Sequence, residues 1–239
     1  MDKNKNSDRP LQKMFMAVPP SYDLLNRLLT FRFDEVWRKK AAAECMKNNP
    51  ENVLDLCCGT GDLVLRLKRM ARPETKITAL DYSEPMLQVA KLKAKRKDLT
   101  GIEFIHGDAA NMPFPDNYFD SIGIAFAFRN LSFYNPDREK FIAEILRVLK
   151  SNGSFVIVET SQPKSLIMRK FFHWYMRWIT APLGGLISGH YGAYKYLAHS
   201  ASHYYNGEEM TRFLIDSGFT GVKTKTFMTG IASLYVATK

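Results

Sequence analysis

Residues 52–67, "NVLDLCCGTGDLVLRL", contain an apolar run of strand length, a turn with two glycines, and then leucines at helical spacing. This order predicts a strand, a tight turn and a helix, which together form the first half of a strand–helix–strand unit. In a sheet of such units the turn lies at the carboxyl end of its strand, where ligands bind. The stretch therefore predicts both the fold class and the place of a site.

Strand and helix patterns alternate outward from this stretch. The strands are short and largely apolar, which is typical of strands buried on both faces of a parallel sheet. We therefore expect an α/β fold with a doubly wound, mostly parallel, seven-stranded sheet that ends in an antiparallel C-terminal hairpin. The expected strands are 52–57, 76–80, 102–106, 119–126, 154–159, 219–227 and 231–238, and the expected helices are 21–46, 61–71, 84–97, 137–150 and 207–217, with turns at 151–153 and 228–230.

The chain of 239 residues is expected to form one domain, 1–239. Residues 47–160 and 207–239 carry the α/β pattern, and residues 161–206 interrupt it as an insertion. From 161 to 207 the chain has ten aromatic residues, four of its five histidines and five Lys or Arg, but no Asp or Glu. We interpret this insertion as a surface for a substrate or a membrane.

The net charge of +10 and the pI near 9.4 favour an anionic partner, either nucleic acid or an acidic membrane surface. Residues 1–13 lack the apolar core of a signal peptide, and the longest apolar run, 122–128, is too short to span a bilayer. Three cysteines form neither a disulfide framework nor a metal-binding pattern, so no metal is predicted. These features favour a reducing cytoplasm.

The glycine turn predicts a cationic ligand. Asp62 stands where a phosphate loop has lysine, and the spacing of the glycines differs from the dinucleotide fingerprint. Asp55 and Asp62 flank the turn, and two carboxylates repel a pyrophosphate but attract an ammonium or a sulfonium. The alternative is a tight strand–helix turn that binds nothing.

Two later strand ends supply further acids. Asp81 ends the second strand, where a carboxylate accepts hydrogen bonds from the two hydroxyls of a ribose. Asp108 and Ala109 follow the third strand, where a carboxylate and a backbone amide meet an adenine edge. Helix and turn capping are the alternative roles of these acids. Together the acids and the glycine turn predict a site for S-adenosylmethionine.

Three segments carry a family resemblance that covers the chain from about residue 22 to its end. "YDLLNRLLTF" (22–31), "DLCCGTGD" (55–62) and "FRNLSFYNPDREKFIAEILRVLKSNG" (128–153) resemble the signatures of the UbiE-type C-methyltransferases. This family methylates polyprenyl quinol rings in menaquinone and ubiquinone synthesis. The resemblance implies a class I methyltransferase fold, S-adenosylmethionine as cofactor, and an N-terminal helical lid at 1–46.

The resemblance also implies roles for single residues. The implied catalytic residue is Arg129, and the implied substrate contacts are Asn130 beside it and Tyr22 and Asn26 in the lid. Ala125 replaces a serine that is common in the family. The candidate cofactor contacts are Asp55, Gly59, Thr60, Gly61, Asp81, Tyr82, Asp108, Ala109 and Ala125.

The implied reaction needs an electron-rich ring carbon. Ionising a phenol of pKa about 10 costs about 4 kcal/mol at pH 7, which a cation at Arg129 would offset. Arginine does not readily deprotonate, so it is not the base. Water and the four histidines of the insertion, His173, His190, His199 and His203, stay open as the base.

Partners follow from the same features. A helix over 164–180 places basic residues beside Trp and Phe, which is typical of a helix at a membrane interface, although the same helix is alternatively an inward wall of the substrate pocket. We expect a polyprenyl quinol as substrate and peripheral contact with the anionic inner face of the cell membrane. No nucleic acid is expected, because the basic run at 91–97 suits the end of a helix.

Several alternatives stay open in the sequence. Naphthoquinol is favoured over benzoquinol as the substrate, and the prenyl length and the oligomeric state, including a homodimer, are not determined. The rival functions are methylation of RNA or of another small molecule, and a membrane-surface protein without catalytic activity.

Overall fold

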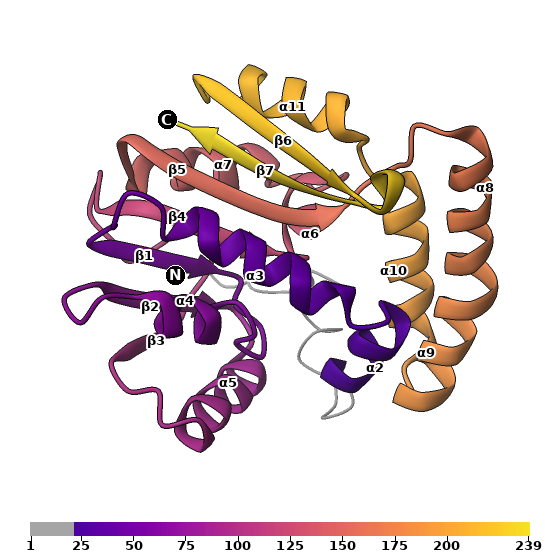
Figure 1. Ribbon diagram of the computed structural model, residues 1–239, viewed down its shortest axis with the longest axis horizontal. Coiled ribbons are helices and arrows are strands. Elements are labelled where there is room, and N and C mark those ends of the chain that lie inside the picture. The colour runs from indigo at the N-terminus through magenta and orange to yellow at the C-terminus, as the bar shows by residue number, and fades with distance from the viewer. Residues whose placement is uncertain (1–21) are drawn as a thin grey trace, which may run out of the picture.

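A computed structural model describes residues 22–239, and Figure 1 shows a central sheet with helices on both faces. The sheet has seven strands in the order β3-β2-β1-β4-β5-β7-β6. Strands β1 to β5 are parallel, and β7 is antiparallel to both of its neighbours, which confirms the predicted fold class. The strands are β1 (Asn52–Leu56), β2 (Lys76–Asp81), β3 (Ile102–His106), β4 (Phe119–Ala125), β5 (Leu149–Thr160), β6 (Gly221–Phe227) and β7 (Ala232–Thr238).

Alternate side chains of the strands serve two cores. On β1, Leu54 and Leu56 pack in the core beneath α7 and α11, whereas Val53 packs in the core beneath α3, α4 and α5. Both layers are apolar, as a sheet covered on two sides requires. The helices of these layers are α3 (Phe33–Cys45), α4 (Val64–Met70), α5 (Glu84–Arg96), α6 (Phe128–Ser132), α7 (Arg138–Val148) and α11 (Gly207–Asp216).

The predicted helix over 21–46 is wrong in one respect, because the structure divides it. Helix α2 (Tyr22–Leu29) ends before a reversal at Phe31 and Arg32, which have φ of 50° and 63°. Thr30 Oγ1 donates to the backbone oxygen of Asn26 at 2.7 Å and contacts the Asp34 carboxylate at the same distance. These bonds hold the reversal that starts α3, although the apolar pattern runs through it without interruption.

Strand β5 begins earlier than predicted. The expected turn at 151–153 is an irregularity inside the strand, where Asn152 has a φ of 63° and the pairing with β4 shifts register between Phe119 and Ser121. The expected helix 137–150 is correspondingly shorter. The predicted hairpin is present, with β6 and β7 joined by η2 (Met228–Gly230).

The insertion folds as helices beside the carboxyl ends of the parallel strands (Figure 1). They are α8 (Leu166–Tyr175), a π-helical turn η1 (Met176–Thr180), α9 (Ala181–Ser188) and α10 (Tyr191–His203). Gly184 lets α9 approach α10, because a Cβ there would lie 2.1 Å from the Tyr194 ring. Leu25 and Leu29 of α2 pack against Tyr194, so α2 rests on the insertion. Within residues 22–239, no helix is both long and apolar enough to cross a bilayer.

Candidate active site

A cavity of about 910 Å³ lies at the carboxyl ends of the parallel strands, between the glycine turn and α10. Nine of the predicted site residues line it, from four strands and the loops or helix that follow them. Topology explains this meeting, because parallel strands end at the same edge of a sheet. The nine are Asp55, Gly59, Thr60, Asp81, Tyr82, Asp108, Ala109, Ala125 and Asn130.

The glycine turn has backbone conformations that side chains rarely adopt. Gly59 and Gly61 have φ of 53° and 87°, and the non-glycine residue Cys57 has a φ of 54°. Gly61 does not line the cavity. A Cβ on it would lie 2.8 Å from Cβ of Ala90, so this glycine permits close packing of the turn against α5 rather than contact with a ligand.

Asp81 organises the turn from the end of β2. Its Oδ2 accepts the backbone N–H of Gly59 at 2.7 Å, and its Oδ1 accepts that of Ser83 at 2.8 Å. Burial raises the pKa of Asp81, although these two hydrogen bonds oppose the rise. Each oxygen has a second lone pair, so the carboxylate can accept further donors from the cavity.

Asp55 is the most deeply buried acid in the cavity. It is 1% exposed, and its Oδ2 has no hydrogen-bond partner among the described residues. Burial raises the pKa of this carboxyl well above its usual value, with the charge of Asp81 adding to the rise. A buried carboxyl oxygen that has no protein donor and lies in a cavity wall can accept a donor, favourably a cationic one, from a ligand.

Asp108 and Ala109 line the cavity beyond β3. Asp108 Oδ1 accepts the backbone N–H of Ala110 at 2.9 Å, which fixes the carboxylate in its turn. Ala109 is buried in the core beneath α7. Asp108 therefore caps its turn, as the alternative reading of the sequence has it, and it also lies on the cavity wall.

Arg129 lies behind the cavity wall rather than on it. The guanidinium is 3% exposed, and Nη1 donates to Glu159 Oε1 at 2.9 Å and to Thr160 Oγ1 at 2.8 Å. Its Nε donates to Ser200 Oγ of α10 at 3.0 Å. Ser200 lines the cavity and Arg129 does not. This placement favours a positioning role for Arg129, and direct contact with a substrate stays a prediction.

Asn130, the neighbour of Arg129 on α6, presents an unused acceptor. Its Oδ1 is buried and has no partner among residues 22–239, while the residue itself lines the cavity. Its backbone oxygen accepts from Asn135 Nδ2 at 2.8 Å, which holds the loop after α6. The geometry fits a ligand that donates a hydrogen bond, such as a hydroxyl.

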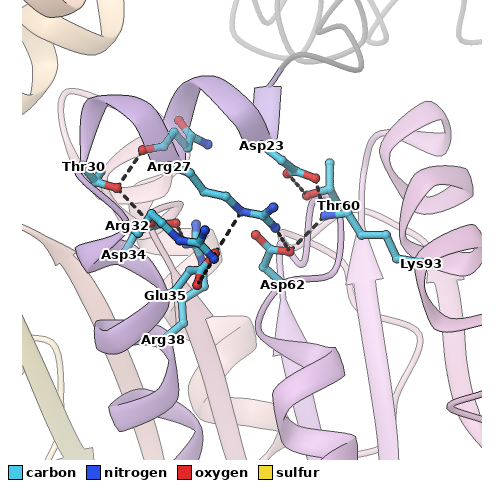
Figure 2. A network of polar contacts seen from close by, with 11 residues as sticks. Asp23, Arg27, Thr30, Arg32, Asp34, Glu35, Arg38, Thr60, Asp62 and Lys93 are labelled. Carbon is cyan, nitrogen blue, oxygen red and sulfur yellow. Dashed lines mark hydrogen bonds and ion pairs between the residues drawn. The ribbon is translucent and has the colours of Figure 1, made fainter. Parts of the chain in front are cut away.

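Helix α2 is bound to the glycine turn by a polar network, shown in Figure 2. Thr60 Oγ1 donates to Asp23 Oδ1 at 2.6 Å, and Asp23 also pairs with Lys93 of α5. Lys93 reaches Asp62 at 2.9 Å, and Arg27 lies 3.8 Å from the same carboxylate. Burial alone would raise the pKa of Asp62, but the neighbouring cations outweigh it and lower the pKa.

This network bears on two predictions. Lys93 belongs to the basic run at 91–97, so part of that run is used inside the protein. Asn26 of α2, a predicted substrate contact, does not line the cavity, and its backbone oxygen accepts a hydrogen bond from Thr30 Oγ1. Tyr22 is the first residue of α2, and its side chain lies outside the described part of the structure.

The sequence model of the ubiE/COQ5 methyltransferase family matches residues 2–239. The chain belongs to this family. Two curated relatives, both named demethylmenaquinone methyltransferase, agree with the match. The protein from Thermus thermophilus is 38% identical over 93% of this chain and 98% of its own. The protein from Deinococcus radiodurans is 37% identical over 98% of this chain and 95% of its own.

Solved structures show the same fold. A SAM-dependent methyltransferase from Aquifex aeolicus superposes with a TM-score of 0.61 at 21% identity, covering 97% of this chain and 99% of that chain. One from Thermotoga maritima gives a TM-score of 0.63 at 19% identity, covering 95% and 99%. At such identities the likeness concerns the fold alone.

Further cavity residues of this methyltransferase-family chain were not predicted. Asp23 and Arg38 come from the N-terminal helices, and Tyr196 and Ser200 come from α10. Arg38 stands in the basic stretch "EVWRKK", but no periodicity or motif indicated that its side chain, or residues of α10, would line the cavity.

The four candidate histidines separate in space. His199 lines the cavity and stacks on His203, with ring centroids 4.4 Å apart. His173 hydrogen-bonds Gln162 Oε1 at 2.7 Å, and burial lowers its pKa. His190 precedes α10 and does not line the cavity. Of the four, His199 is therefore the one that a bound substrate can approach.

Proposed function

We propose that the protein transfers a methyl group from S-adenosylmethionine to a ring carbon of a polyprenyl quinol, with demethylmenaquinol as the substrate. The observation that carries the proposal is one cavity lined by acids from three successive parallel strands in a chain of the ubiE/COQ5 family. The names of the curated relatives favour the naphthoquinol over the benzoquinol.

Each acid would bind a different part of the cofactor, according to its position at the edge of the sheet. Asp81, already bound to the glycine turn, would accept the ribose hydroxyls, and Asp108 with Ala109 would meet the adenine. Asp55 would accept the ammonium of the methionine half, which its unpartnered Oδ2 requires. Bound in this way, the cofactor supplies an electrophilic methyl group on a sulfonium.

The substrate half of the cavity is formed by α6, the loop after it, and α10. Asn130 Oδ1 would accept a ring hydroxyl and orient the quinol. The aromatic rings of Phe133, Tyr134 and Tyr196 line the same region and suit a planar ring. Methyl transfer forms one carbon–carbon bond as the sulfur–methyl bond breaks, and the ring carbon then releases its proton to regain aromaticity.

The decisive experiment is turnover of the purified protein with S-adenosylmethionine and matched short-chain quinols under reducing conditions. We expect methylated product from demethylmenaquinol and a lower rate with the benzoquinol counterpart. Cofactor binding without turnover of either quinol would overturn the proposed substrate. Methylation of RNA in the same assay would support the rival methyltransferase function instead.

Cofactor binding is expected to release protons at pH values above the ordinary titration range of an aspartate. The raised pKa of Asp55 means that the free protein holds this carboxyl protonated above its ordinary titration range. A bound ammonium favours the carboxylate, so the proton leaves and affinity rises with pH through that window. Calorimetry in two buffers of different ionisation enthalpy measures the protons released. Asp55→Asn should release fewer, and an unchanged proton count in that variant would contradict the assignment.

Membrane contact is part of the proposal. Four residues of α8 and η1, called here the α8 face, point away from the core: Ile167, Phe171, Trp174 and Trp178 are 50–83% exposed. The alternative of an inward pocket wall does not hold for these four. Lys170 and Arg177 are exposed on the same segment, and the insertion has no acid. Apolar rings beside cations are typical of a surface that enters the headgroups of an anionic bilayer.

Reversing the two exposed cations, Lys170→Glu and Arg177→Glu, is expected to weaken binding to anionic vesicles by at least about 2 kcal/mol, since each basic residue contributes about 1 kcal/mol. Arg169 is left in place, because its Nε donates to the backbone oxygen of Pro163 at 3.0 Å. Vesicle sedimentation measures the change, and turnover of a tail-less quinol should persist.

The matched control reverses two exposed lysines on the edge strand β6, outside the α8 face, Lys223→Glu and Lys225→Glu. This variant has the same net charge as the α8 variant. Equal loss of vesicle binding in both would mean that net charge, rather than the α8 face, drives the contact.

A further inference from the structure

Arg38 is a buried cation that lines the cavity from α3. It is 8% exposed and shares the wall beneath the glycine turn with Asp55, Cys58 and Asp62. Within residues 22–239 it is the one lysine or arginine among the lining residues, which include six aspartates. Among the described residues, Arg38 is therefore the one arginine or lysine on a wall whose other charged side chains are aspartates.

The guanidinium is held in a fixed orientation. Nη1 pairs with the carboxylate of Asp34, which in turn contacts Thr30 Oγ1 at 2.7 Å (Figure 2). The ring of Phe126 lies 4.8 Å from Cζ and restricts the guanidinium on another side. Among the described residues Asp34 is its only hydrogen-bond partner, so a group with five N–H donors retains donors for a ligand.

Neighbouring cations are already engaged. Lys93 pairs with Asp23 and Asp62, and Arg27 pairs with Glu35 and Asp62. Neither of these two cations lines the cavity. Arg38 acts electrostatically on both Asp55 and Asp62, since it lowers the pKa of each against the effect of burial. Arg38 and Asp55, whose Oδ2 has no partner among the described residues, line the same cavity.

An acidic group and a basic group side by side match an amino acid, whose ammonium and carboxylate share one carbon. We propose that Arg38 binds the α-carboxylate of the methionine half of the cofactor, beside Asp55 on the ammonium. The inference rests on the proposed cofactor, and it adds α3 to the elements that recognise it. A charge-assisted bond from a preoriented guanidinium is stronger than one between neutral groups.

Paired ligands test this contact directly. The wild-type protein, Arg38→Gln and Arg38→Lys would be titrated by calorimetry with S-adenosylmethionine and with its decarboxylated analogue. We expect the wild type to prefer S-adenosylmethionine by about tenfold or more, the range of one hydrogen bond to a charged group. Arg38→Gln should lose that preference, because the substitution weakens the binding of S-adenosylmethionine alone. Arg38→Lys should keep part of the preference. Lys39→Gln, exposed on the same helix, is the control and should behave as wild type.

The comparison of two ligands on one protein separates binding from folding. Arg38→Gln leaves Asp34 buried without its cation, so the double variant Asp34→Asn/Arg38→Gln, which removes both charges, serves as a second test. Wild type that binds both ligands equally, or a folded glutamine variant that keeps the full preference, would overturn the role of Arg38. Wild type that binds neither ligand would overturn the proposed cofactor itself.

Discussion

Replacing Arg129 with methionine is expected to destabilise the folded protein by about 3–5 kcal/mol, because Glu159 would remain as a buried, unpaired carboxylate. Glu159 is 0% exposed and accepts from both the guanidinium and the backbone N–H of Arg129. Urea unfolding followed by circular dichroism measures the free energy. A loss below about 1 kcal/mol would contradict the pairing, since surface pairs contribute that little.

The double variant Arg129→Met/Glu159→Gln is the control for this prediction. It removes both charges at once, so it should recover much of the lost stability. Methylation rates in the same variants test the role of Arg129. If the guanidinium touches the reacting ring, its loss should lower the methylation rate of both variants by about 10²–10³-fold. If Arg129 only positions other residues, its loss should act mainly by disordering Ser200 and α10, so cofactor binding and substrate binding should change together with the methylation rate.

Asp81→Ala is expected to lower the affinity for S-adenosylmethionine by about a hundredfold or more. Two hydrogen bonds from ribose hydroxyls to a charged group contribute about 1.5 kcal/mol each at the lower bound, and about 1.4 kcal/mol is tenfold. The substitution also frees the backbone N–H of Gly59, which loosens the glycine turn. Calorimetry on variants whose circular dichroism matches the wild type measures the loss.

Two variants accompany this measurement. Asp81→Asn retains one acceptor oxygen and should bind with intermediate affinity. Asp216→Ala removes an exposed aspartate at the end of α11 that does not line the cavity. This variant should bind S-adenosylmethionine as the wild type does. Unchanged affinity in a folded Asp81→Ala protein would mean that the cofactor site lies elsewhere.

The sequence was sufficient for the features that depend on local periodicity. Short apolar runs predicted the strands, and the parallel order brought Asp55, Asp81 and Asp108 to one edge without any knowledge of side-chain contacts. The break between α2 and α3 was not predictable, because non-glycine residues at Phe31 and Arg32 adopt the left-handed conformation there.

Contacts between distant segments account for the rest. Arg129 meets Glu159 across thirty positions and Ser200 across seventy-one, so its burial depends on how β5 and α10 are placed. The family resemblance implied that Arg129 would face the ligand, whereas Arg38 is the arginine that lines the cavity in the structure. No pattern within α3 distinguishes Arg38 from the lysines that follow it, and only the tertiary fold turns it inward.

The two ends of the insertion meet at one point, since Gln162 and Asn206 form a bridge and Gln162 Nε2 donates to the backbone oxygen of Ala201 at 2.6 Å. The strand β5 and the helix α11 are therefore joined by neighbouring residues, whatever the length of peptide between them. We therefore expect that the peptide between them can be exchanged while the strands of the sheet keep their register. A chimera built between positions 162 and 206 has to preserve the acceptor at Ser200 and the Tyr194 surface on which α2 packs, because α2 is in turn bonded to the glycine turn.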